Sequence, residues 1–353
     1  MRKLNGYIAR SVLGAVAMVL LVIVALDAIS ALVDELGSIK GNYTIAEVFV
    51  YVGLTLPGRI YENIPFSALV GCLIGLGSLA GSSELVVMRA AGVSLLRITW
   101  AVMKPVLWFI VLGLVIGEYL TPFSDQIAES RRSLAQGDTR ALESRRGLWN
   151  REGNEYMHFN AVEPNGRLHG VTRYLFDDAG RMQSSSFSAT AIYQGDYWQE
   201  ENVVLTRFED NQSHLQTIER RRWETALSPR LLNILVLDPA ALSIRSLHSY
   251  AGYLDGQGVD SKEYWLAFWQ KVLQPVATAS LVLIAISFIF GPLREVTMGQ
   301  RIFSGVVVGI VFRTVQGLLG PSSIVFGFPP LMAVAAPVLV CGLLGVLLLR
   351  RAR

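Results

Sequence analysis

The chain has 353 residues, of which 52% are hydrophobic and 17% are charged. This composition is too apolar for a soluble protein of this size and is typical of a protein embedded in a membrane. Its two cysteines, Cys72 and Cys341, both lie within apolar runs, which excludes a disulfide framework and a CxxC metal site.

Six apolar runs are candidates for membrane-spanning helices, since a helix needs roughly 20 residues to cross the hydrocarbon core. They cover residues 12–33, 66–80, 98–120, 265–290, 302–319 and 331–349. The first run is longer than the core of a typical signal peptide, so we expect it to be retained. The stretch 44–56 is also apolar, but Pro57, Gly58 and Pro65 break the pattern after it. We therefore expect an interfacial helix that leads to a short second span.

A short helix is predicted at about residues 82–92, between the second and third spans. Ser83 can act as its N-cap, Glu84 then lies in the first turn, and Gly92 can end the helix in a left-handed conformation. Leu85 and Met88 are one turn apart, while Glu84 is on a different face. This pattern suits a helix that docks into a groove on another protein, and equally an ordinary loop helix.

The distribution of charge predicts the orientation. Outside the large central segment there are 15 basic residues, and 10 of them lie in the N-terminus, the loop around Glu84, the 292–301 loop and the C-terminal tail. The positive-inside rule places these parts, and both termini, in the cytoplasm. Residues 121–263 carry a net charge of −4 while the remainder carries +7, and we expect this segment outside the membrane.

The outer segment has the pattern of an all-β domain. Alternating runs occur at residues 155–162, 167–176, 182–193, 197–208 and 215–226, and the turns between them contain Gly, Asn, Asp and Pro. This spacing predicts a sandwich, jellyroll or barrel, with a helical stretch on either side. The run Glu219-Arg220-Arg221-Arg222 is interpreted as a solvated strand edge that discourages association between sheets.

The chain lacks the common catalytic signatures. It contains no GxxxxGK[ST] phosphate loop and no GxSxG, and its four histidines are not spaced as metal ligands. We therefore predict no catalytic residue, no metal and no cofactor in this chain, and any ATP-driven work needs a partner. A nucleic-acid role for the arginine run is excluded by its outward position.

Ionisable residues within the spans are candidates for a binding site, because a charge at mid-bilayer costs roughly 2.5–3.5 kcal/mol on insertion scales. Asp27 lies toward the outer end of the first span and Arg313 toward that of the fifth, with Gln316 one turn from Arg313. Asp27 and Arg313 either form an ion pair or line a cavity for an anionic, amphipathic ligand.

Three groups of residues match motifs of a known family. They are residues 76–80 (LGSLA) with 83–88 (SELVVM), residues 287–294 (SFIFGPLR) with Met298, Gly299 and Arg301, and residues 238–244 (DPAALSI) with Leu247, His248 and Tyr250. Together they resemble the LptF/LptG permeases of the lipopolysaccharide exporter, and the resemblance covers essentially the whole chain. The sequence Gly147-Leu148-Trp149 before the first strand resembles the LptG branch more than the LptF branch.

The resemblance implies an inner-membrane ABC transporter permease subunit: six transmembrane helices with an inserted periplasmic β-jellyroll. It implies a heterodimer with LptF on two copies of the ATPase LptB, which binds ATP and magnesium, and contact with LptC. The complex would extract lipopolysaccharide from the inner membrane and pass it to a periplasmic bridge toward the outer membrane.

The resemblance also implies roles for individual residues. Glu84, together with Leu85, Met88 and Arg89, would belong to the helix that couples the permease to the ATPase. Lys40 resembles basic positions that meet the phosphates of lipid A, although Asp34 and Glu35 nearby weaken the attraction.

The expected domains are residues 1–122 with the coupling helix, 123–263 with the jellyroll, and 264–353. Two alternatives remain open at this stage, namely a lipoprotein-release type of ABC permease and a non-transport membrane protein. The latter would be an assembly scaffold or an enzyme acting on polyisoprenyl-linked sugars.

Overall fold

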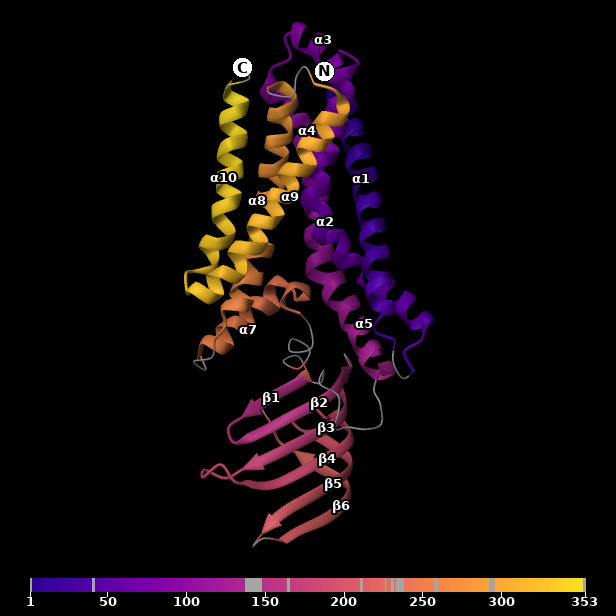
Figure 1. Ribbon diagram of the computed structural model, residues 1–353, viewed down its shortest axis with the longest axis vertical. Coiled ribbons are helices and arrows are strands. Elements are labelled where there is room, and N and C mark those ends of the chain that lie inside the picture. The colour runs from indigo at the N-terminus through magenta and orange to yellow at the C-terminus, as the bar shows by residue number, and fades with distance from the viewer. Residues whose placement is uncertain are drawn as a thin grey trace. The chain divides into compact units, whose positions relative to one another are not determined.

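The fold was analysed in a computed structural model (Figure 1). It describes residues 2–351 except residues 40–41, 137–147, 164–165, 210–211, 226, 230–231, 233–237, 257–259 and 292–295. The chain forms two compact units: a helical unit of residues 1–30, 56–121 and 243–353, and a second unit of residues 31–55 and 122–242 that contains the sheet.

Six helices among the described residues are long and apolar enough to cross a membrane. The helical elements are α1 (Arg2–Leu36), α2 (Ile45–Gly81), α3 (Glu84–Ala90), α4 (Leu95–Val115), the π-helical turn η1 (Ile116–Leu120), α5 (Thr121–Gln136), the 3₁₀ turn η2 (Pro239–Ala241), α7 (Ile244–Gly256), α8 (Lys262–Phe290), α9 (Met298–Phe326) and α10 (Pro330–Arg351). The start of α1 and the end of α10 lie at the same end of the helical unit as α3 (Figure 1).

The second span is longer than predicted. The interfacial helix and the short span are one continuous helix, α2, which runs through Pro57 and Pro65. Pro65 has no N–H, so the carbonyl of Tyr61 loses its helical donor. Gln274 of α8 supplies a replacement, because its Nε2 donates to Tyr61 O at 3.0 Å. A neighbouring helix thus satisfies the freed backbone group, which allows proline inside a membrane helix.

The third span also continues further than predicted. The predicted span ends at residue 120, but the helix passes through η1 into α5, across Thr121 and Pro122. Pro122 lies directly after the π-helical turn, where the regular hydrogen-bond pattern is already altered.

Helix α1 packs on α2 at very short range. A Cβ atom at Gly71 would lie 2.5 Å from Val16 Cα, and one at Gly75 would lie 2.9 Å from Val12 Cα. The hydroxyl of Ser11 donates to Gly75 O at 3.2 Å. The two glycines are four residues apart on one face of α2, the small-residue spacing that lets membrane helices approach closely.

The inserted sheet is antiparallel and has six strands in sequential order. They are β1 (Leu148–Glu152), β2 (Glu155–Glu163), β3 (Arg167–Phe176), β4 (Met182–Tyr193), β5 (Trp198–Glu209) and β6 (Gln212–Trp223). The five predicted strands are confirmed within a few residues, and β1 is an addition. The open sheet fits a jellyroll-like domain, so the predicted fold class is confirmed.

A backbone irregularity in β5 changes which of its side chains are buried. Asn202 adopts a left-handed backbone with φ of 54°. Trp198 and Glu200 are buried before it, while Val203 and Leu205 are buried after it. The in–out alternation therefore shifts by one residue at Asn202, while β5 keeps one register with β4 and with β6 on both sides of this residue.

The arginine run was only partly understood from the sequence. It lies on β6, which is an edge strand, and Arg220 and Arg222 are exposed there as predicted. Arg221 instead turns onto the opposite face, where its Nε lies 2.6 Å from the carboxylate of the fully buried Glu200.

Candidate functional site

One face of the short helix α3 packs against its own chain. Leu85 and Met88 are 3% and 7% exposed and belong to the core of the helical unit. These two side chains therefore point inward within this chain, and their part in coupling to an ATPase stays a prediction. Val86 and Val87 are exposed instead, because residues between positions i and i+3 point to the other side of a helix.

Glu84 starts α3 and is held by two hydroxyl groups. Ser82 Oγ donates to Glu84 Oε1 at 2.8 Å, and Tyr7 Oη donates to the same oxygen at 3.3 Å. The prediction that Ser83 caps the helix is wrong, because Ser83 has a left-handed backbone with φ of 61° whereas an N-cap is extended. Glu84 is therefore oriented from the preceding turn and from the start of α1.

The end of α3 follows the prediction. Gly92 has a φ of 81°, in the region that favours glycine. Its N–H donates to Arg89 O at 3.0 Å, and the N–H of Val93 donates to Met88 O at 3.1 Å. These bonds satisfy the last carbonyls of the helix and set the direction in which the chain leaves it.

Two arginines connect the neighbourhood of α3 to the later helices. Arg301 of α9 is 5% exposed, and its Nη1 donates to Gly77 O near the end of α2 at 3.0 Å. Arg89 of α3 lies over the ring of Phe290, the last residue of α8, with 5.9 Å from guanidinium carbon to ring centroid. Arg89 thus links α3 to the end of α8, and Arg301 links α9 to the part of α2 that precedes α3.

A second polar group lies within the membrane-length helices. Asp27 of α1 forms an ion pair with Arg59 of α2, with 3.1 Å between Oδ2 and Nη1. Asp27 is thus paired with a residue that lies between the predicted interfacial stretch, 44–56, and the predicted second span, 66–80. Both side chains are partly exposed, which keeps some of the pair accessible to water or ligand.

The other predicted cavity residues lie on α9 or outside the described residues. Arg313 is exposed on α9, and Gln316 is half-buried one turn away. The ion pairs of the described residues do not join Arg313 to Asp27. Lys40 lies outside the described residues.

A polar junction around η1 was not predicted from the sequence. Lys271 of α8 is buried, donates to Gly117 O at 3.4 Å and lies 5.3 Å from the centre of the Tyr61 ring. Glu118 Oε2 accepts from the backbone N–H of Ile244, the first residue of α7, at 2.7 Å. The sequence did contain a sign of this junction, because Lys271 is a charged residue inside the apolar run 265–290. Charged residues within a membrane usually have a fixed partner.

The first turns of α7 pack closely beside this junction. Leu247 and Tyr250 are buried there, and the ring of Tyr264 meets the Tyr250 ring edge to face at 4.7 Å between centroids. Burial raises the pKa of the Tyr250 hydroxyl well above its ordinary value, which keeps the side chain neutral.

These groups suit binding and the transmission of motion. Within the described residues, no three or more His, Cys, Asp or Glu side chains gather so as to hold a metal ion. The half-buried carboxylate of Glu84 and the exposed guanidinium of Arg313 can both form charge-assisted hydrogen bonds with a partner or ligand.

The fold and the match to known sequences define the class of protein. Residues 6–351 match the family described as lipopolysaccharide export system permease LptF/LptG. The chain therefore belongs to this family of lipopolysaccharide export permeases. Family membership and the six membrane-length helices support a multi-pass protein of the inner membrane.

Within the family, the resemblance is to LptG. The chain is 35% identical to the lipopolysaccharide export system permease protein LptG of Escherichia coli K12 over 339 residues, which are 95% of this chain and 94% of that protein. It is also 35% identical to LptG of Haemophilus influenzae over 345 residues, with 96% and 95% of the two chains covered.

Proposed function

We propose that this chain is the permease subunit of an ABC transporter that extracts lipopolysaccharide from the inner membrane. The observation that carries the proposal is the match to the LptF/LptG family over residues 6–351. The lipid would pass to a periplasmic bridge toward the outer membrane, and both chain termini would be cytoplasmic.

The energy would come from a separate ATPase, LptB, which binds the ATP and magnesium. Its contact with this chain would be α3, whose exposed Val86 and Val87 flank the oriented carboxylate of Glu84. Because α3 packs onto the core of the helical unit and is linked to the end of α8, movement of the ATPase would reach the membrane part of the chain. The second permease chain would be LptF, and LptC would join the complex.

The lipid cavity would be lined by the polar residues of α1, α2 and α9. Arg313 is an exposed cation on a membrane-length helix, and Arg59 is a cation only partly covered by its partner Asp27. Phosphate groups of a glycolipid are the ligands that such guanidinium groups favour. Lys40, beyond the first span, would add a further cation to this path.

The test combines purification with crosslinking. A photoreactive amino acid at Arg313 or Gln316 is expected to capture lipopolysaccharide in cells, and the purified chain is expected to bring the ATPase with it. A matched probe at Leu347, which is 59% exposed near the end of α10, is expected to capture much less.

Two outcomes would contradict the proposal. One is capture of a lipoprotein or a polyisoprenyl-linked sugar, with no lipopolysaccharide, from Arg313 and Gln316. The other is purification of an intact chain that never carries an ATPase subunit.

A further inference from the structure

One face of the six-stranded sheet has an apolar part that the chain fills with its own side chains. Its core consists of Met157, Phe159, Val162, Leu168, Val171, Ala191, Trp198, Trp223, Leu227 and Leu232. Trp198 and Trp223 are almost fully buried, and Trp198 Nε1 donates to Leu227 O at 2.7 Å. This part of the face is occupied, so acyl chains would have to displace packed tryptophans.

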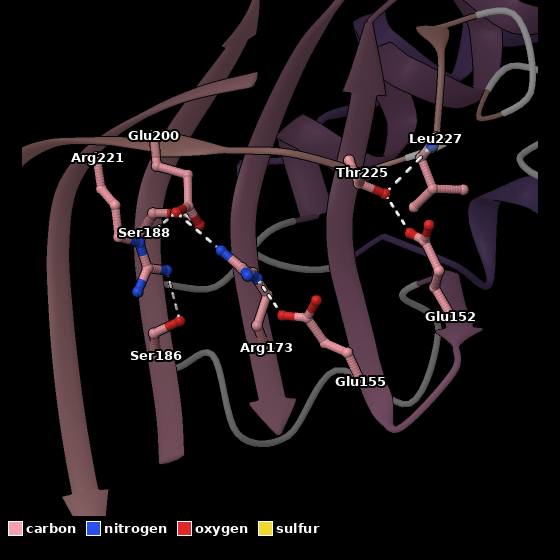
Figure 2. Close-up of polar contacts among 9 residues, drawn as sticks. All are labelled: Glu152, Glu155, Arg173, Ser186, Ser188, Glu200, Arg221, Thr225 and Leu227. Atoms are coloured by element: carbon pink, nitrogen blue, oxygen red, sulfur yellow. Dashed lines mark hydrogen bonds and ion pairs between the residues drawn. The ribbon is translucent and has the colours of Figure 1, made fainter. Parts of the chain in front are cut away.

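The neighbouring part of the same face carries a network of charges (Figure 2). Arg173 lies between two carboxylates, 2.5 Å from Glu155 and 3.0 Å from Glu200. Arg221 bonds the same Glu200 at 2.6 Å and donates to Ser186 Oγ at 2.8 Å. The Arg173 guanidinium also lies 4.7 Å from the Trp223 ring, so this network borders the apolar core directly.

Two adjoining cavities lie here, and the first of them opens over this network. The first has a volume of about 540 Å³, and Gln183, Ser184, Arg207 and Phe208 line it together with the network. The second has a volume of about 510 Å³ and shares Gln183 and Phe208 with the first. Each volume lies within the ~300–1,000 Å³ usual for pockets that hold small molecules. We call the two cavities together the polar groove.

The polar groove carries an excess of positive charge. Arg173, Arg207 and Arg221 face only the carboxylates of Glu155 and Glu200 in the first cavity, which leaves one positive charge. Arg207 is exposed and has no ion-pair partner among the described residues. Its guanidinium is therefore available to an anionic group on a ligand.

We propose that the polar groove binds an acidic saccharide, namely the sugar part of lipopolysaccharide that bears phosphate or carboxylate groups. The proposal rests on the proposed function, because family membership supplies the glycolipid. Hydroxyl, amide and guanidinium groups match a polyhydroxylated ligand, and Phe208, which is 43% exposed, offers a flat apolar face to a sugar ring.

The lipid part of the same molecule does not suit the groove. Acyl chains would remove the arginines and carboxylates from water without replacing their hydrogen bonds, which is strongly unfavourable. The sheet would thus guide the headgroup, while the acyl chains travel elsewhere.

The binding test uses the full chain, assembled with its partners in lipid nanodiscs, and isothermal titration calorimetry. The probe is the core oligosaccharide released from lipopolysaccharide. The expected result is saturable binding that Arg207→Ala weakens about tenfold, the effect of losing one charge-assisted hydrogen bond. Arg207→Lys is expected to retain part of the affinity. Arg220→Ala is the matched control, because this exposed arginine lies on the edge strand away from the groove, and it is expected to bind normally.

Two further ligands test whether binding in the polar groove needs both the sugar and its acidic groups. The same oligosaccharide after dephosphorylation and carboxyl reduction is expected to bind weakly, and inorganic phosphate alone is expected to bind weakly as well. Equal binding of the neutralised sugar, or no effect of Arg207→Ala, would overturn the proposal. Phosphate that binds as tightly as the oligosaccharide would reduce the groove to a simple anion site and would also overturn it.

Crosslinking separates this proposal from the proposed function. A photoreactive residue at Gln183 is expected to capture lipopolysaccharide with its core sugars and not a form truncated to its lipid part. Capture from Arg313 without capture from Gln183 would reject the groove and keep the transport function. If neither the probe at Arg313 nor the probe at Gln183 captures lipopolysaccharide, both the saccharide site and the transport function are rejected.

Discussion

At the scale of single residues, Glu84 shows how a surface carboxylate can be oriented before a partner arrives. Ser82 and Tyr7 both donate to one of its oxygens, which leaves the second oxygen for an outside donor. A carboxylate held in one orientation loses less conformational freedom on binding than a mobile one.

We predict that Glu84→Ala lowers the affinity for the ATPase subunit roughly tenfold while insertion of the chain stays normal, because a desolvated charge contact contributes about 1.5–3 kcal/mol. Arg89→Ala is the control, and we expect a smaller effect because its guanidinium is turned toward Phe290. The measurement is the amount of ATPase that co-purifies with each variant, divided by the amount of chain inserted in the membrane. Unchanged co-purification in Glu84→Ala would make this carboxylate an ordinary surface group.

His158 links the stability of the sheet to pH. It is 5% exposed on β2, beside the Trp149 ring at 4.9 Å between centroids, and its burial lowers its pKa below the usual value of about 6.5. The unfolded state therefore binds a proton more readily than the folded state. Stability from the neutral imidazole is complete above about pH 6.5 and is lost as the pH falls toward the folded-state pKa.

The expected result is faster amide hydrogen exchange in β1 and β2 at pH 5.5 than at pH 7.5, after correction for the intrinsic exchange rate. His158→Gln in the full chain should remove most of this pH dependence. His214→Gln, which changes an exposed histidine on β6, should retain it. Equal pH dependence in both variants would exclude His158 as the cause.

At the scale of elements, the contact between α1 and α2 depends on the absence of side chains. Gly71→Leu would place a Cβ 2.5 Å from Val16 Cα, so the two helices must separate. We predict a loss of about 2–4 kcal/mol in stability, as for an overpacked core. Gly14→Leu is the control, because nothing lies within 4 Å of a Cβ there. Thermal unfolding in detergent would measure the difference, and equal values for the two variants would contradict this account.

Elements defined by local periodicity could be predicted from sequence, and those defined by distant partners could not. The apolar runs and alternating strands followed from hydrophobic pattern and turn residues. The continuity of α2 depends on Gln274, which lies 213 residues from Tyr61. The strand β1 is only five residues long, too short for a clear alternation.

In the candidate site, too, the features that depend on distant parts of the chain could not be predicted from the sequence. The position of Glu84 at the start of a short helix was predictable, but the inward direction of Leu85 and Met88 is set by the long helices packed beneath them. Arg221 was assigned to the solvated edge because the whole arginine run was taken as exposed. Alternation along β6 instead turns Arg221 away from Arg220 and Arg222, onto the face that holds Glu200.

At the scale of the whole molecule, the prediction concerns the membrane topology. In a background without Cys72 and Cys341, a cysteine at Gln212 on β6 should react with an impermeant reagent applied to intact spheroplasts. A cysteine at Gly299, which is exposed near the start of α9, should react only after the membrane is opened. Labelling of Gly299 from outside would reverse the orientation and remove α3 from the side where an ATPase could reach it.

The contact between Glu118 and Ile244 matters for the architecture of the insertion. The carboxylate at the π-helical turn holds the first N–H of α7, although 126 residues separate the two positions. The point near residue 121, where the chain leaves the helical unit for the second time, is thereby fastened to the point near residue 243, where it returns. Closing a long loop adds only about 0.6 kcal/mol for each doubling of its length, so a fastened base tolerates insertions of very different size. The sheet is in this sense a replaceable module, whose strands can be lengthened, recombined or exchanged during evolution while the helices keep the same connection.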